Sequence, residues 1–266
     1  MKKVTIFFDL EGWWEAPYRG KFDLNKNVNK ILKILDKHKA KAVFNTCGVV
    51  VEFFPGLVKK IYENGHEIAS HGYRHENFIQ LPSKTLNNIL KKTEDLIKEV
   101  TSSKPVGVRC PWLLHNQKVY SVIKSRSYKW VSNQYTPFPE LFENPFNAYP
   151  LIDVHRLAKI AVKLQHTFFY PRKPFYKNGL LEIPLFSSMD GDLLSLVSAE
   201  QKSPKSLLNF ALNTLKKQFN NSKSYFNLNF HPWLIGSSNR AILLDNTLKY
   251  ASNKDIEFVL ARDLIK

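Results

Sequence analysis

The sequence predicts an α/β protein built on a parallel sheet, either open or closed into a barrel. β-branched and aromatic segments alternate with segments of helical spacing along most of the 266 residues. Acidic, imidazole and guanidinium side chains follow several of the strand-like segments, at the ends where parallel sheets carry their ligand sites. The length suits one α/β domain of barrel size. These observations together place the expected site at the carboxyl ends of the strands.

Strand-like and helix-like segments alternate through the first half of the chain. Strands are expected where β-branched and aromatic residues run together, at Val4–Leu10, Ala42–Thr46, Gly65–Ala69, Val106–Arg109 and Trp130–Ser132. Helices are expected where apolar residues recur every three or four positions, at Val28–His38, from Pro55 to Gly65, from Ser83 to Ile97 and at Val119–Ser125. Pro55 suits a first helical turn, and Ser83 is expected to act as an N-cap.

Residues 135–181 interrupt this rhythm with several prolines and are expected to form an insertion over the barrel mouth. Within it, apolar residues from Val154 to Phe168 follow one helical face, and no acidic residue occurs between Arg156 and Leu181. Residues 154–177 are therefore predicted to rest on an anionic membrane surface. A lid helix whose basic face is simply solvated is an equally consistent interpretation.

The alternation resumes near residue 181 and continues toward the end of the chain. Strands are expected at Leu181–Phe186, Tyr225–Phe230 and Ile256–Leu260, with helices opening at Ser203-Pro204 and running over Ala241–Ala251. Neither internal repeats nor a low-complexity linker occur. Residues 1–266 are therefore predicted to form a single domain.

The composition is basic and rich in aromatic residues. Lys and Arg outnumber Asp and Glu by 39 to 23, which gives a formal charge of +16 and favours polyanionic partners. Nucleic acids are one class of polyanion, but the sequence has no recognised nucleic-acid-binding motif, so no nucleic acid is expected as a partner. Cys47 and Cys110 are expected to be free thiols in a reducing compartment. Without a signal-peptide or spanning pattern, the predicted location is the cytoplasm, peripheral at the inner membrane face if the basic segment binds lipid.

Two histidines after the third strand suggest a metal centre. His71 and His75 are four residues apart, so both imidazoles face one ion if the intervening loop turns helically. The spacing alone is also met by an ordinary surface or core pair. A carboxylate from Asp9 or Glu11, at the end of the first strand, would complete the ligand set of a hydrolytic metal site with a position left for water.

Four segments of this chain resemble the motifs of the polysaccharide deacetylase family, carbohydrate esterase family 4, in the family's order. They are Phe7–Gly12, Asn64–Glu76, Arg109–Trp112 and Asn227–Trp233. The resemblance, also described as chitooligosaccharide deacetylase homology, spans nearly the whole chain. It implies a distorted (β/α)7 barrel, similar to a TIM barrel, and a metal-dependent N-deacetylase.

The resemblance also implies a metal ion, with zinc as the expected cation. Glu11, His71 and His75 are predicted to hold a divalent ion that acidifies its bound water and polarises the acetyl carbonyl. The reverse assignment, with Asp9 as the ligand and Glu11 behind it, stays open.

Four further residues are predicted to be catalytic. Asp9 is expected to be the general base, and Arg109, by resemblance, pairs with Asp9 and keeps it ionised. The backbone N–H of Trp112 would complete an oxyanion hole, and His231 would protonate the departing amine. Structural alternatives are that Arg109 only bridges two loops and that His231 caps a strand. Stacking on sugar rings is expected for Trp13, Trp14 and Trp233, unless these rings simply fill the barrel mouth.

Two departures from the family pattern bear on function. Leu10 separates Asp9 from Glu11, as in a branch of the family that acts on cell-envelope glycans or linear amides. Val131 stands where the fourth motif normally has the Asp that tunes the catalytic His, and Asp190 or Asp192 from another loop is a candidate substitute.

The predicted substrate is an N-acylated amino sugar in a cell-envelope glycan or its lipid-linked precursor. A deacylase of small linear amides on the same scaffold is one alternative. A glycan-binding pseudoenzyme, suggested by Val131, is another.

Overall fold

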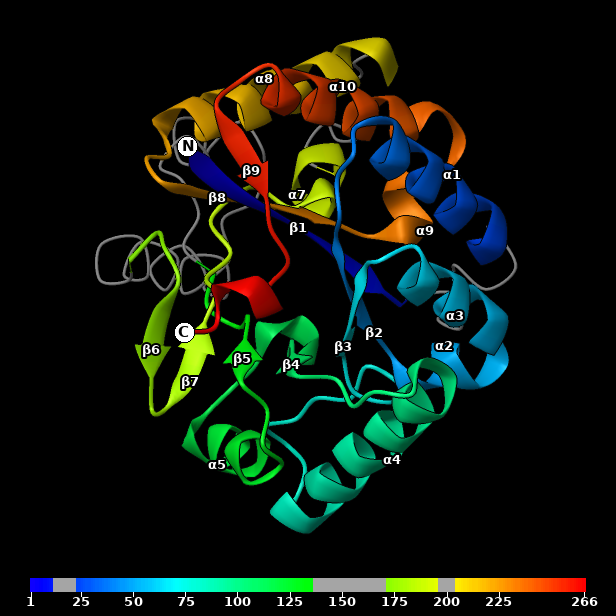
Figure 1. The fold of residues 1–266 in the computed structure, drawn as a ribbon, viewed down its shortest axis with the longest axis vertical. Coiled ribbons are helices and arrows are strands. Elements are labelled where there is room, and N and C mark those ends of the chain that lie inside the picture. Colours follow the sequence, from blue (N-terminus) through cyan, green and yellow to red (C-terminus); the bar gives the residue numbers. More distant parts are fainter. Residues whose placement is uncertain (12–22, 136–170, 196–203) are drawn as a thin grey trace, which may run out of the picture.

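The structure is a computed structural model that describes residues 1–11, 23–135, 171–195 and 204–266. The described strands form a nine-stranded sheet in the order β6-β7-β5-β4-β3-β2-β1-β8, and β9 pairs with β1 beside this path (Figure 1). The strands are β1 Lys2–Leu10, β2 Val43–Thr46, β3 Glu67–Ser70, β4 Gly107–Val108, β5 Trp130–Val131, β6 Phe175–Lys177, β7 Leu180–Glu182, β8 Tyr225–Phe230 and β9 Ile256–Phe258.

Helices surround this sheet (Figure 1). They are α1 Leu24–Lys37, α2 Gly48–Phe53, α3 Pro55–Glu63, α4 Ser83–Thr101, α5 Gln117–Ser125, α7 Asp190–Ser195, α8 Pro204–Asn221, α9 Pro232–Ile235 and α10 Ala241–Ser252. Pro55 opens α3 as predicted, but Ser83 is not a cap. The N-cap of α4 is Pro82, and Ser83 is the first helical residue, without a capping hydrogen bond from its side chain.

Every pairing from β7 through β5, β4, β3, β2 and β1 to β8 is parallel, so the carboxyl ends of these strands share one edge. Between β8 and the segment after β7, side chains make the contact: Asn227 Nδ2 donates to the Pro184 carbonyl at 2.5 Å, and Asn229 Nδ2 to Ser187 Oγ at 3.0 Å. The predicted distorted (β/α)7 barrel is confirmed.

The strand β1 has three partners in the sheet, because β2, β8 and β9 all pair with it. Its residues Ile6, Phe7 and Phe8 are completely buried, as expected of a parallel strand covered on both faces. This packing fixes the end of β1, where Asp9 and Glu11 lie.

Four elements were not expected from the sequence: α2, β6, α7 and α9. The strand β6 falls inside the predicted insertion 135–181 and forms an antiparallel hairpin with β7. Its two-residue turn, Asn178-Gly179, has φ values of 54° and 78°, as a type I′ turn requires. The predicted basic helix and most of the 154–177 surface lie outside the described residues.

The described helices are all too short or too polar to cross a bilayer. Cys47 and Cys110 are both free and buried, in agreement with the expectation of unpaired thiols.

His66 gives the fold a pH dependence that is separate from the predicted site. Its Nδ1 accepts the Ala42 N–H at 3.1 Å, and burial first, then Lys41, lowers its pKa from 6.5 to about 4. Between those values the unfolded chain binds more protons than the folded one, so stability falls as the pH falls. We expect this group to reduce the free energy of unfolding by about 2 kcal/mol between pH 7 and pH 5.

Urea denaturation at the two pH values measures this effect. The matched variant is His66→Gln, whose amide oxygen can accept the same N–H without titrating, and it should lose most of the slope. An identical slope in the variant would contradict the assignment.

Candidate functional site

Glu11, His71 and His75 converge at the carboxyl edge of the sheet. Glu11 Oε2 lies 2.9 Å from His71 Nε2 and 2.7 Å from His75 Nε2. One donor atom from each residue lies within 4.8 Å of the others, and this is the group of possible metal donors found among the described residues. Asp9 is not part of it. The placement thus favours Glu11 over Asp9 as the carboxylate ligand.

The loop that carries the two histidines is not helical, and the expectation of a helical turn was wrong. His75 has a φ of 61° and Gly72 a φ of 74°, so two left-handed residues redirect the chain. The Glu76 carboxylate accepts the backbone N–H groups of Tyr73 at 3.0 Å and Arg74 at 2.9 Å. These bonds stabilise a turn that brings both imidazoles to one point without helical geometry.

The hydrogen bonding of His71 fits a cation at this point. Its Nδ1 lies 2.8 Å from the Arg109 carbonyl oxygen, which can only accept, so Nδ1 is the protonated nitrogen. A neutral His71 therefore turns the lone pair of Nε2 toward the Glu11 carboxylate. Two facing lone pairs need a proton or a cation between them. In a metal-ligating histidine, the other ring nitrogen is ordinarily hydrogen-bonded in the way that Nδ1 is here.

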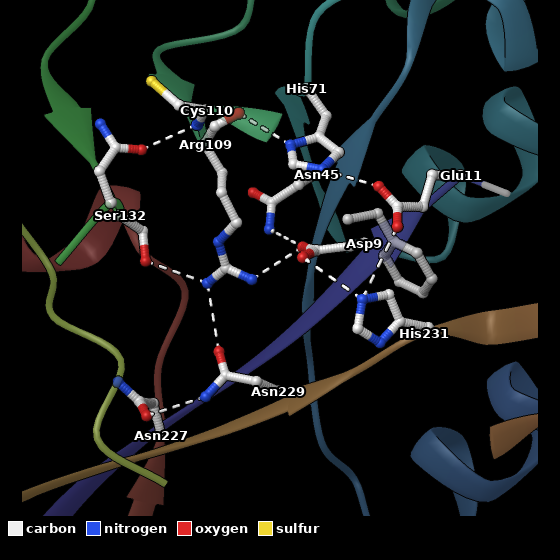
Figure 2. Close-up of polar contacts among 12 residues, drawn as sticks. Asp9, Glu11, Asn45, His71, Arg109, Cys110, Ser132, Asn227, Asn229 and His231 are labelled. Carbon is white, nitrogen blue, oxygen red and sulfur yellow. Dashed lines mark hydrogen bonds and ion pairs between the residues drawn. The ribbon is translucent and has the colours of Figure 1, made fainter. Parts of the chain in front are cut away.

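The two oxygens of Asp9 have different partners, as Figure 2 shows. Its Oδ1 accepts from Arg109 Nη1 and from Asn45 Nδ2, both at 2.7 Å, while its Oδ2 lies 4.0 Å from His231 Nε2. Burial by itself would raise the pKa of Asp9, but Arg109, followed by His71 and His231, lowers it below its ordinary value. Asp9 is thus an ionised carboxylate with one oxygen turned toward His231.

Arg109 is completely buried and tied to three strands or strand ends. Besides Asp9, it donates from Nη2 to Ser132 Oγ at 3.0 Å and to Asn229 Oδ1 at 3.2 Å, and its guanidinium lies 4.4 Å from the centre of the Phe7 ring. A residue that only linked two loops would not need this set of contacts inside the barrel.

His231 is oriented by Asp190, a residue of α7. The Asp190 carboxylate lies 2.6 Å from His231 Nδ1 and accepts the His231 backbone N–H at 2.8 Å, leaving Nε2 directed toward Asp9 and Glu11. Burial by itself would lower the pKa of His231, but Asp190 raises it to about 10. Val131 is buried in β5, and the carboxylate that contacts His231 Nδ1 is that of Asp190, one of the two candidates named from the sequence. The side chain of the other, Asp192, lies outside the described residues.

Aromatic rings flank the site. The Trp112 ring contacts His75 edge-on at 4.6 Å and is 62% exposed, with a backbone φ of 58°. The half-buried Trp233 ring lies 5.7 Å from that of His231. Trp13 and Trp14 lie outside the described residues, and the proposed stacking by these two stays a prediction.

Sequence reasoning missed three polar partners of the site: Asn45, Ser132 and Asn229. Asn45 and Asn229 stand inside strands in which their immediate neighbours are mostly apolar or aromatic, and all three are buried. A buried amide within a strand requires a partner, so these positions carried a usable signal.

Comparisons with known proteins give the family to which part of this chain is similar. Residues 2–131 match the model of the family described as polysaccharide deacetylase. A peptidoglycan deacetylase of Helicobacter pylori is 30% identical over 124 residues, 45% of this chain and 42% of that protein. The chain spans only about two fifths of the length of that protein and of a peptidoglycan-N-acetylglucosamine deacetylase of Bacillus cereus, which is 32% identical over 116 residues.

Solved structures share the fold at low identity. A protein from Mycobacterium smegmatis, described as a polysaccharide deacetylase, superposes with a TM-score of 0.73 at 19% identity, covering 98% of this chain and 88% of that one. The PuuE allantoinase superposes with a TM-score of 0.68 at 12% identity, covering 98% and 88%. These likenesses concern the fold, while the sequence match concerns the family. On that match, residues 2–131 of the chain belong to the polysaccharide deacetylase family.

Proposed function

We propose that this protein is a metal-dependent hydrolase that removes an N-acetyl or other N-acyl group from an amino sugar of a cell-envelope glycan or its lipid-linked precursor. The observation that carries the proposal is the convergence of Glu11, His71 and His75 beside the two pairs Asp9–Arg109 and His231–Asp190. Metal-assisted hydrolysis of an amide needs ligands for the ion, a general base and a general acid. The triad, the ionised carboxylate and the protonated imidazole are suited to these three roles.

Two nitrogens and one carboxylate oxygen would hold the cation, and zinc is the ion we propose for this donor set. When bound, such an ion acidifies water and polarises the acyl carbonyl. Glu11 and His71 are buried or nearly so, and His71 is fixed by the Arg109 carbonyl. The ligands are therefore held in place before substrate arrives.

Asp9 and His231 divide the proton transfers between them. Asp9, kept ionised by Arg109, accepts the proton of the attacking water. His231, kept protonated by Asp190, donates a proton to the amine as it leaves. Their facing atoms are 4.0 Å apart, so both can reach the same reacting amide. The backbone N–H of Trp112, whose ring contacts that of His75, would stabilise the oxyanion.

The sugar class rests on the relatives and on the aromatic rings. The Helicobacter pylori relative is a peptidoglycan deacetylase. Trp112 and Trp233 lie beside His75 and His231 respectively, where each could pack against a pyranose ring. A cytoplasmic enzyme would meet the lipid-linked precursor at the membrane. The basic residues 154–177 would suit binding to the anionic surface of that membrane. Flotation with anionic vesicles, comparing Lys159→Glu and Lys163→Glu with the unaltered chain, tests this last part.

The direct test is a screen for released acetate with the purified protein and zinc. The substrates are N-acetylated chito-oligosaccharides, peptidoglycan fragments, lipid-linked N-acetylated sugars and a small linear amide. We expect release from at least one sugar substrate and none from the linear amide. Release from the linear amide alone would replace the proposal by the deacylase alternative, and no release from any of them would contradict both.

A further inference from the structure

Asn45 lies directly beside Asp9 on the neighbouring strand. The two residues are register partners across the parallel pair β1 and β2, and both are buried. Asn45 Nδ2 donates to Asp9 Oδ1 at 2.7 Å, the same distance at which Arg109 Nη1 reaches that oxygen. Figure 2 shows both donors on one side of the carboxylate and His231 on the other. Two donors thus occupy Oδ1, and neither is placed on Oδ2.

The other end of the Asn45 amide argues against a purely structural role. Its Oδ1 is buried and has no hydrogen-bond partner among the described residues. A buried, unpaired carbonyl oxygen destabilises the folded state, and an apolar side chain of similar size would avoid that loss. The rings of Phe8 and Phe44, one position earlier on the same two strands, stack on the opposite face of the sheet, so Asn45 lies on the face that carries Asp9 and Arg109. An unfavourable buried group that persists beside these residues points to a function for its other end.

We propose that Asn45 is a positioning residue that determines which oxygen of Asp9 reacts. With Arg109 it binds Oδ1 from two directions, which stops the carboxylate from rotating about its Cβ–Cγ bond. Oδ2 is then the oxygen that receives the proton of the attacking water, on the side of His231. Arg109 supplies the charge that keeps Asp9 ionised, and Asn45 supplies the second point that fixes its orientation. This inference rests on the proposed function of Asp9 as the general base.

The test is a kinetic comparison of Asn45→Leu with the unaltered, zinc-loaded protein on the substrate that the screen identifies. Loss of orientation is expected to lower kcat about 10- to 100-fold, with KM and bound zinc unchanged. The matched control is Thr46→Val. Thr46 is buried on the same strand, and its hydroxyl donates to the Phe44 carbonyl at 3.1 Å, so its loss should leave kcat unchanged.

A second arm separates positioning from general packing. In an Asp9→Asn background, Asn45→Leu should cause no further loss of rate, because the group that it orients no longer acts as a base. If Asn45→Leu does not fold, Asn45→Ser keeps a polar side chain that is too short to reach Oδ1, and it should show the same fall in kcat.

Unchanged kcat in a folded, zinc-loaded variant would overturn the role of Asn45, as would an undiminished effect in the Asp9→Asn background. In both of these outcomes the unaltered protein is active and the proposed function stands. Failure of the proposed function is recognised separately, because the unaltered protein itself would then release no acetate.

Discussion

His71→Ala is expected to remove bound zinc and to reduce acetate release to the background rate. His71 Nε2 lies 2.9 Å from Glu11, and its Nδ1 is held by the Arg109 carbonyl, so its loss leaves Glu11 and His75 as the ligands of the described site. Two remaining ligands seldom retain a zinc ion, and without the ion the reaction loses its Lewis acid. Zinc per chain, measured by mass spectrometry of the purified protein, and acetate release are the two readouts.

The matched control for this substitution is His38→Ala. His38 is also largely buried, but its ring contacts Asp245 at 2.6 Å on α10 and belongs to none of the groups at the site. It should keep both zinc and activity. A His71→Ala protein that retained one equivalent of zinc would contradict the assignment of this residue.

Asp9→Asn is expected to lower kcat about a thousandfold while zinc remains bound. The isosteric amide fits between Arg109 and Asn45 but cannot accept the proton of water, and general-base catalysis contributes about 10²- to 10⁴-fold. Removing this carboxylate also leaves the buried Arg109 guanidinium without its partner at 2.7 Å. The free energy of unfolding should therefore fall by roughly 3 kcal/mol.

The control is Asp245→Asn, which removes a surface ion pair with Lys37 that should contribute little to stability. Loss of zinc in Asp9→Asn would instead show that Asp9 is a ligand. That result would revive the alternative assignment of the two carboxylates.

Much of the fold could be predicted from the sequence because apolar residues recur with different periods in its strands and in its helices. The strand Tyr225–Phe230 was predicted with its observed bounds, and α3 begins at Pro55 as expected. The helix α2 was missed because Val49, Val50 and Val51 are β-branched and continue the apolar run of β2, so their pattern is that of a strand. The hairpin turn Asn178-Gly179 was a readable signal that lay inside the predicted insertion.

The principal residues of the candidate site could be predicted from the sequence, but the contacts that orient them could not. Asp9, Glu11, His71, His75, Arg109 and His231 all lie at or after the carboxyl ends of strands, and parallel strands bring these ends together. The link between His231 and Asp190 joins residues 41 positions apart, and no local pattern specifies which of two acidic residues turns inward. The left-handed turn at His75 was equally hidden, because a non-glycine residue gives no sequence signal for a positive φ.

Zinc titration of chelator-treated protein, followed by acetate release, tests the central claim most directly. If Glu11, His71 and His75 hold the ion used for hydrolysis, activity should be absent after chelation and should return in proportion to added zinc, saturating at about one equivalent per chain. Glu11→Gln should fail to recover under the same titration. Full activity in the chelated protein, or equal recovery by Glu11→Gln, would contradict the account.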